Sequence, residues 1–137
     1  MPITDLTIHT PGQGLHEITH DVLEAITPFR VETGLLTVFI RHTSASLMIQ
    51  ENADPSARRD LEKWLNRHVP ENDPLYTHTD EGPDDMPSHI KAAITATSLT
   101  IPIENHRPTL GTWQGIYLWE HRRMPHVRKV TIHAAAD

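Results

Sequence analysis

Short apolar runs separated by polar breaks recur along the chain and predict several β-strands. Residues 3–9 alternate apolar and polar side chains imperfectly, as a half-buried strand does. Residues 35–40 and 45–49 are continuous apolar and β-branched runs, which are too short for a good helix and typical of central strands. Three further strands are predicted nearer the C-terminus, at residues 99–103, 110–120 and 127–134.

Apolar residues at helical spacing predict short helices between the strands. Residues 18–26 carry an apolar side chain at every fourth position, and Pro28 stops the helix that this spacing predicts. A second short helix is expected to begin near Asp85, with Ile90 and Ile94 at the spacing of a buried face.

A third helix is predicted between these two. Asp54 followed by Pro55 is typical of a helix start, because Asp caps the free N–H groups and Pro fits the first turn. Pro70 ends the helix. Its expected apolar face consists of Ala57, Leu61, Trp64, Leu65 and His68.

The predicted strand at residues 110–120 is apolar on both faces. Ile116 and Leu118 point to one side, and Tyr117 and Trp119 to the other. Such a strand needs cover on both faces, from a second sheet or from a neighbouring subunit.

The mixture of predicted helices and strands indicates an α+β fold. No repeat or linker divides the chain, so we expect residues 1–137 to form a single domain.

Composition excludes several classes of protein. The formal net charge of −6 argues against a general nucleic-acid binder, which would carry a basic face. With no cysteine, the chain has no disulfide, thiolate zinc site or cysteine nucleophile. It shows no signal peptide and no stretch of the roughly 18 apolar residues that span a bilayer. We expect a cytoplasmic protein that binds neither nucleic acid nor a membrane.

Polar residues gather where two predicted strands end. Arg41-His42-Thr43-Ser44 follows one strand, and side chains at strand ends have a rigid support yet reach solvent, which suits a binding site. Taken alone, this cluster is more simply explained by a strand-end histidine that is satisfied by its neighbours. Glu51 and Asn52 follow the next strand without the capping role of Asp54, although acidic loop residues are usually only solvated.

A third polar cluster lies in the long irregular segment and the helix after it. His78 and His89 lie close in sequence to four acidic residues, Asp85 among them. Metal sites combine imidazole with carboxylate, but no compact metal-binding signature is present. An acidic surface loop before a capped helix is the alternative.

The segment Gly111-Thr112-Trp113-Gln114-Gly115 forms the fourth cluster. Glycine within a strand commonly marks a bulge or the close approach of another group. A ligand, another chain or simply a core tryptophan beside a bulge would each account for it.

Taken in order, these segments resemble the YjbQ-like family. The resemblance extends from about residue 5 to residue 133 and rests on HTSA at 42–45, ENADP at 51–55, EGPDDMPSHIK at 81–91, SLTIPI at 98–103 and LGTWQGI at 110–116. It implies an α+β fold with strands in a β-sandwich, two to three short helices, and a homotrimer formed through packed sheets. One departure concerns the turn at residues 104–108, where the family usually has a small Asn-Gly type pair and this chain has Glu-Asn-His-Arg-Pro.

The resemblance also implies an activity and a site. Members of the family are named as secondary thiamine-phosphate synthases, which join a hydroxymethylpyrimidine diphosphate to a thiazole phosphate and release pyrophosphate. The expected substrate is therefore a small phosphorylated metabolite. The implied catalytic residues are His42, Glu51, Asp85 and His89. The resemblance places Thr112, Trp113 and Gln114 beside this site as substrate-binding residues. We add Asn52 from the second polar cluster, and Arg41 and Lys91, either of which would neutralise a departing diphosphate.

The working hypothesis is that His42, His78 and His89 converge to bind one divalent cation. Zinc fits three imidazoles with an open position, and magnesium is the alternative ion. Glu51 or Asp85 would orient a ligand or act as a base. Two other functions stay open: a metal-dependent hydrolase or lyase acting on another phosphorylated metabolite, and a non-catalytic metabolite-binding trimer.

Overall fold

The strands of this protein form two antiparallel sheets that pack face to face. The computed structural model describes residues 2–137. The larger sheet has the order β1 (Ile3–Thr10), β8 (His126–Ala136), β3 (Gly34–Ile40), β5 (Ser98–Glu104) and β6 (Arg107–Pro108). The smaller sheet has the order β2 (Gly14–Glu17), β7 (Gln114–Glu120) and β4 (Ala45–Glu51).

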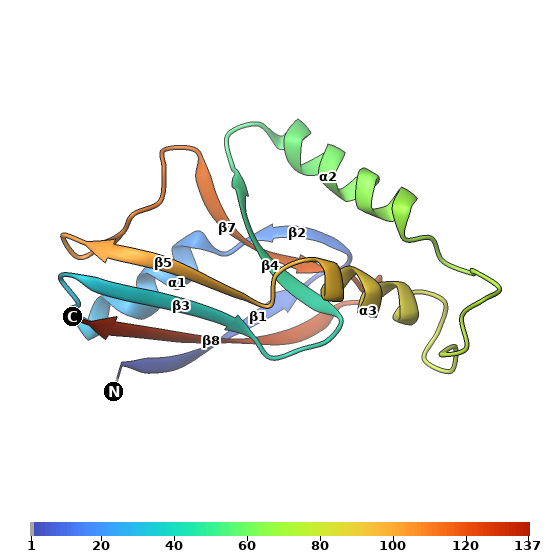
Figure 1. The fold of residues 1–137 in the computed structure, drawn as a ribbon, viewed down its shortest axis with the longest axis horizontal. Helices are drawn as coiled ribbons and strands as arrows, with labels where there is room; N and C mark the ends of the chain where they lie inside the picture. Colours follow the sequence, from blue (N-terminus) through green and yellow to red (C-terminus); the bar gives the residue numbers. More distant parts are fainter. Residues whose placement is uncertain (1) are drawn as a thin grey trace.

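Three α-helices complete the fold: α1 (Thr19–Ile26), continued by the short 3-10 helix η1 (Thr27–Phe29), α2 (Pro55–His68) and α3 (Asp85–Ile94). In Figure 1, the end of the first helix and the turn after β5 lie at one end of the long axis, and the loop between α2 and α3 forms the other end, next to α3. The α+β class, the sandwich and the three helices are as predicted. No helix among residues 2–137 is long and apolar enough to cross a membrane.

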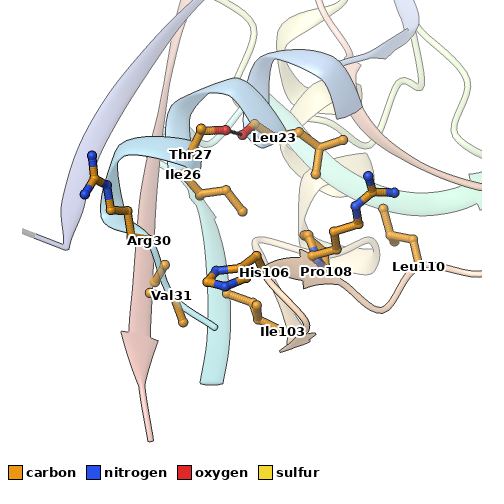
Figure 2. Close-up of a pocket in the computed structure, with 11 residues that line it drawn as sticks. Leu23, Ile26, Thr27, Arg30, Val31, Ile103, His106, Pro108 and Leu110 are labelled. Carbon is orange, nitrogen blue, oxygen red and sulfur yellow. Dashed lines mark hydrogen bonds between the residues drawn. The ribbon is translucent and has the colours of Figure 1, made fainter. Parts of the chain in front are cut away.

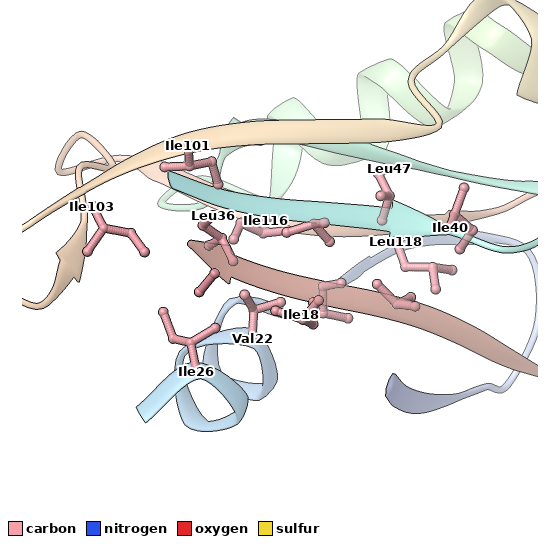
Figure 3. Packing of buried hydrophobic residues seen from close by; sticks show 14 of the residues in the cluster. Ile18, Val22, Ile26, Leu36, Ile40, Leu47, Ile101, Ile103, Ile116 and Leu118 are labelled. Carbon is pink, nitrogen blue, oxygen red and sulfur yellow. The ribbon is translucent and has the colours of Figure 1, made fainter. Parts of the chain in front are cut away.

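The main core fills the space between the two sheets. Leu36, Val38 and Ile40 point into it from β3 and are at most 2% exposed, as the two-residue period of a strand requires. Ile116 and Leu118 face them from β7 (Figure 3). The helix α1 closes one side of this core with Ile18, Val22 and Ile26, the three positions whose spacing predicted it.

A second, smaller core confirms that β7 needs cover on both faces. Tyr117 and Trp119 point away from the main core and pack with Leu15 of β2 and with Leu65 and Val69 at the end of α2. The cover therefore comes from the five-stranded sheet on one face and from α2 on the other.

The expected strand at residues 110–120 is too long at its start. In the structure β7 begins at Gln114, because a turn occupies the residues before it. The Gln114 amide donates to the Gly111 carbonyl (3.1 Å), and the Gly111 amide donates to the Gln114 side chain (2.7 Å). The strands β2 and β6 were not predicted from the sequence, since both are very short.

The buried face of α2 is narrower than its spacing predicts. Leu65 is the buried residue of this helix, whereas Trp64 is 51% exposed and stacks on His68 with ring centroids 4.1 Å apart. Asp54 does cap the helix, since its carboxylate accepts a hydrogen bond from the Ser56 amide (2.9 Å).

The helix α3 differs more strongly from its prediction: Ile90 packs against the second core as expected, but much of the buried face is polar. Ile94 is 61% exposed, while Asp85, Ser88 and Lys91 are buried. Polar groups can be buried only if they are paired, so α3 must meet polar partners on the body of the protein.

The two cores make a specific prediction about the tryptophans. Trp119→Ala should lower the free energy of unfolding by about 3–5 kcal/mol, because it leaves a cavity in the second core. Trp64→Ala, on the exposed face of α2, should cost about 1 kcal/mol or less. Urea unfolding followed by circular dichroism measures both. Equal costs for the two variants would contradict the assignment of Trp119 to a core.

Candidate metal centre

Two histidines and one aspartate meet where the long loop joins α3. His78 lies in the loop, whereas Asp85 and His89 lie one turn apart on α3 and so share a face of the helix. One ligand atom of each residue lies within 4.8 Å of the others. His78 Nε2 is 2.8 Å and His89 Nε2 is 3.2 Å from the same Asp85 oxygen, Oδ2.

The second nitrogen of His89 determines how the site behaves. Nδ1 is 3.0 Å from the carbonyl oxygen of Thr43, which can only accept a hydrogen bond, so Nδ1 carries the hydrogen. In a neutral ring the lone pair of Nε2 then points at the carboxylate oxygen of Asp85. Two electron-rich atoms at this distance require a positive charge beside them, either a second proton on the ring or a cation. A backbone carbonyl on the far nitrogen is one of the usual partners of a metal-binding histidine.

Arg122, just after β7, holds Asp85 in place. Its Nη1 donates to Asp85 Oδ1 (2.8 Å), its Nε donates to Asp84 Oδ2 (3.1 Å), and its Nη2 donates to the Glu81 carbonyl (2.9 Å). One oxygen of Asp85 is thereby occupied and the other is turned toward the histidines. Burial by itself would raise the pKa of Asp84, but hydrogen bonds from the Arg123 amide and from Arg122 outweigh it and hold that pKa below its usual range.

The three side chains differ in exposure in a way that suits an open site. The Asp85 side chain is 6% exposed, His89 is 32% exposed and His78 is 51% exposed. The carboxylate is therefore shielded and oriented, while both imidazoles can be reached from solvent. Catalytic zinc sites have this character, with fixed protein ligands and a position left for water or substrate.

Comparison with known proteins decides the family. The family model described as "UPF0047 protein YjbQ-like" matches residues 4–137. The UPF0047 protein sll1880 of Synechocystis is 51% identical over 132 residues, which cover 96% of this chain and 90% of that protein. YjbQ of Escherichia coli O157:H7 is 47% identical over 85% of each chain. The chain belongs to the YjbQ-like UPF0047 family.

Solved structures agree with this assignment. A crystal structure of an uncharacterized YjbQ/UPF0047 protein from Clostridium acetobutylicum has a TM-score of 0.88, with 36% identity over 96% of this chain and 99% of that one. A hypothetical protein from Aeropyrum pernix has a TM-score of 0.90, with 25% identity over the whole of both chains. The sandwich described above is therefore the YjbQ-like fold.

In this YjbQ-like chain, His42 does not join the other two histidines. Its Nε2 accepts a hydrogen bond from the Lys129 amide (2.8 Å), and Nδ1 lies 3.4 Å from Arg128 Nη1. Burial lowers the pKa of His42, and the Arg128 guanidinium lowers it further. The ring is thus turned toward β8, although its neighbour Thr43 reaches His89 through the backbone.

Two predicted phosphate-binding side chains also point elsewhere. Arg41 lies 3.4 Å from Asp5 of β1 in an exposed ion pair. Lys91 is buried, and its ammonium donates to Asn66 Oδ1 of α2 (2.6 Å). Burial lowers the pKa of Lys91.

The remaining predicted residues form a second polar region at the far end of the small sheet. The register pairs Glu51 with Gln114 at one end of β4, and Ala45 with Glu120 at the other. The seven residues of β4 span roughly 20 Å, so this region lies far from the candidate metal centre within one chain. Asn52 donates to the Trp113 carbonyl through its backbone amide (2.9 Å), and Trp113 is 64% exposed. Thr112 is exposed in the same turn.

A buried ion pair that is connected to the site through Arg122 was not predicted from the sequence. Glu120 at the end of β7 and Arg128 of β8 are almost fully buried, and Arg128 Nε donates to Glu120 Oε1 (2.7 Å). Thr10 donates to the same oxygen (2.6 Å), and Arg128 also donates to Ser44 Oγ (2.9 Å). The sequence offered one signal for this pair, because Glu120 is a charged residue at the end of an otherwise apolar strand.

His121, which follows Glu120 in the sequence, was not predicted as a buried residue either. His121 is 1% exposed, and its Nε2 lies 2.9 Å from Ser46 Oγ. Burial lowers the pKa of His121 to about 3, so the ring is neutral at physiological pH. The ring is buried, and its centroid lies 5.6 Å from that of the Trp119 ring.

The buried pair predicts a pH-dependent loss of stability in Arg128→Gln. Burial alone would raise the pKa of Glu120, but hydrogen bonds from Arg128 and Thr10 hold it below its usual range. In the native protein, Glu120 therefore contributes stability above its unfolded-state pKa, and this is lost as the pH falls. The variant leaves a buried unpaired carboxylate and should lose about 3–5 kcal/mol at pH 7.

The difference between the native protein and Arg128→Gln should shrink as the pH falls, beginning above about 4.5, because the buried Glu120 of the variant lacks its partner, has a raised pKa and loses its charge on protonation. Urea unfolding at pH 7 and pH 4 measures this difference in the free energy of unfolding. The double variant Glu120→Gln/Arg128→Gln is the control, because both of its side chains are neutral. A loss of stability that is the same at both pH values would contradict the role assigned to this pair.

Proposed function

We propose that His78, Asp85 and His89 bind one divalent metal ion, and that this protein is a cytoplasmic enzyme acting on a small phosphorylated metabolite. The observation that carries the proposal is the approach of His89 Nε2 to Asp85 Oδ2 while Nδ1 is committed to a carbonyl. A cation beside these two atoms removes their repulsion. Two imidazoles and one carboxylate are a zinc ligand set, whereas magnesium prefers oxygen alone. Zinc is therefore the proposed ion.

The chain's own residues would prepare this site before any ligand arrives. Arg122 keeps Asp85 Oδ2 directed at the histidines, and the Thr43 carbonyl keeps His89 in one tautomer. His78, on the exposed loop, supplies the side of the site through which a ligand can enter. When bound, the metal ion would polarise a phosphoryl oxygen and stabilise the charge that develops on it. His42 stays a predicted ligand that its present hydrogen bonds do not favour.

The reaction is proposed from the family resemblance together with this site. A synthase that joins two phosphorylated precursors needs positive charge at the departing pyrophosphate, which the ion would provide. Hydrolysis or elimination of another phosphorylated metabolite would use the same residues. A non-catalytic trimer that binds such a metabolite is the third possibility. Product analysis separates the three: pyrophosphate that requires both thiamine precursors, phosphate released from a single substrate, or no turnover.

We also propose a homotrimer formed through the outer face of the five-stranded sheet. No helix or second sheet formed by residues 2–137 covers this face, which carries the exposed side chains of Leu35, Phe39 and Ile3. A second copy is a natural cover for it. Because the Trp113 region and the candidate metal centre are far apart in one chain, a neighbouring copy is also the way in which they could meet.

Metal analysis tests the central proposal. Tag-free protein should contain about one zinc ion per chain, and His89→Ala or Asp85→Asn should lose most of it, because each removes one ligand of a small set. His20→Ala is the matched control, since His20 is an exposed histidine on α1. Mass spectrometry of the native protein gives the metal-to-chain ratio.

His42→Ala, measured in the same way, separates the two ligand assignments. Retained zinc would exclude His42 as a ligand, and lost zinc would include it. Zinc content that is unaffected in His89→Ala and Asp85→Asn would refute the proposed centre whatever His42 does.

Light scattering tests the trimer. The native protein should have about three times the chain mass of 15.5 kDa, and Phe39→Glu should shift it toward one chain, because a charge would be buried in the sheet interface. Leu75→Glu, at an exposed apolar residue of the long loop, should leave the mass unchanged. If light scattering gave the mass of a single chain for the native protein, the proposed interface would be ruled out.

A further inference from the structure

A large pocket lies away from the candidate metal centre. It has a volume of about 820 Å³ and is formed by α1, η1, the β5–β6 turn and the residues that follow the turn. Figure 1 places these elements at the end of the molecule opposite α3. Pockets of this size hold small organic ligands.

The lining of the pocket is apolar except at its rim. Leu23, Ile26, Val31, Ile103 and Leu110 line it, and Figure 2 shows their side chains around a shared space. Such a surface favours the apolar body of a ligand, because burying it removes apolar area from water.

All ionisable residues that line the pocket are basic. They are Arg30, His106 and Arg107, and none of them forms an ion pair with a carboxylate of residues 2–137. In Figure 2 the His106 ring lies beside Ile103, while Arg30 stands at the edge with its guanidinium turned outward. For a chain of net charge −6 this is a local excess of positive groups. An anionic head group on an apolar body complements both the rim and the walls.

The backbone gives an independent reason to single out His106. Asn105 (φ 52°) and His106 (φ 65°) form the two-residue turn between β5 and β6, in which Glu104 pairs with Arg107. A hairpin turn with two positive φ angles favours glycine at its second position. The His106 amide donates to the Glu32 carbonyl (3.0 Å), a bond that glycine would also make. The imidazole is thus held at a conformationally unfavourable position, as is common for side chains that contact ligands.

We propose that this pocket binds a small amphipathic anion, a carboxylate or a phosphate on an apolar body. The anionic head lies at the His106 and Arg107 rim, where an imidazole N–H and a guanidinium donate to its oxygens. The apolar part lies against Ile26, Ile103 and Leu110. The site is independent of the metal centre, so the two proposals can fail separately.

Calorimetric titration with matched eight-carbon probes tests the proposal. Octanoate and octyl phosphate, both below their micelle concentrations, should bind with at least tenfold higher affinity than octanol or octylammonium. Whichever head group binds more tightly identifies the class of natural ligand. The zinc content of the protein should not change during the titration.

Two glycine substitutions in the turn supply the decisive comparison. His106→Gly should lower the affinity for the anions about tenfold or more without lowering the midpoint of urea unfolding, because it removes the imidazole and relieves the backbone. Asn105→Gly relieves the same turn but leaves the pocket lining intact, so it should bind as the native protein does. Arg107→Gln should weaken anion binding and leave octanol binding unchanged.

Three results would overturn the proposal. Octanol binding as tightly as octanoate would show that the basic rim plays no part. Equal loss of affinity in Asn105→Gly and His106→Gly would attribute the effect to the backbone. Absence of binding by every probe, together with a fall in molecular mass in Leu23→Glu, would assign the pocket to a second copy of the chain.

Discussion

The ion pair between Glu120 and Arg128 supports most of the arrangement described here. A buried carboxylate and a buried guanidinium must each have a partner, because neither tolerates isolation from water. Their shared hydrogen bonds with Thr10 and Ser44 connect β7 and β8 to the end of β1 and to the loop between β3 and β4. This pair joins β7 of the smaller sheet to β8 of the larger sheet.

The same pair connects the core to the candidate metal centre along two routes. The Arg122 amide donates to Glu120 Oε2 (3.1 Å), and the Arg122 side chain then holds Asp85. Arg128 also holds Ser44, whose neighbour Thr43 offers the carbonyl that orients His89. Of the buried polar residues of α3, Asp85 has its charged partner in Arg122, whereas Lys91 donates to Asn66 of α2. The position of Asp85 and the tautomer of His89 thus depend on charges that lie outside the cluster.

Periodicity predicted the elements that face one uniform environment. The strands β3 and β4 and the helix α1 are apolar on the face that the core covers, so their spacing identifies them. Periodicity was wrong where polar partners replace apolar ones, as in α3, where Ile94 is exposed and Lys91 is buried. It was also wrong at residues 110–113, where a glutamine side chain closes a turn that apolar spacing cannot reveal. The family itself was identifiable from motifs, because motifs record residue types and order without requiring geometry.

The sequence by itself determined the residue types available to the site, the segments that carry them and the α+β class of the fold. Only the tertiary structure decided which of them meet. His78, Asp85 and His89 come together because a loop folds back onto the first turns of α3. His42 is turned away because the Lys129 amide of the neighbouring strand β8 binds its ring nitrogen, and Glu51 and Gln114 lie at the far end of a rigid strand. Hydrogen-bond competition and strand length are properties of the folded chain, which residue order alone does not contain.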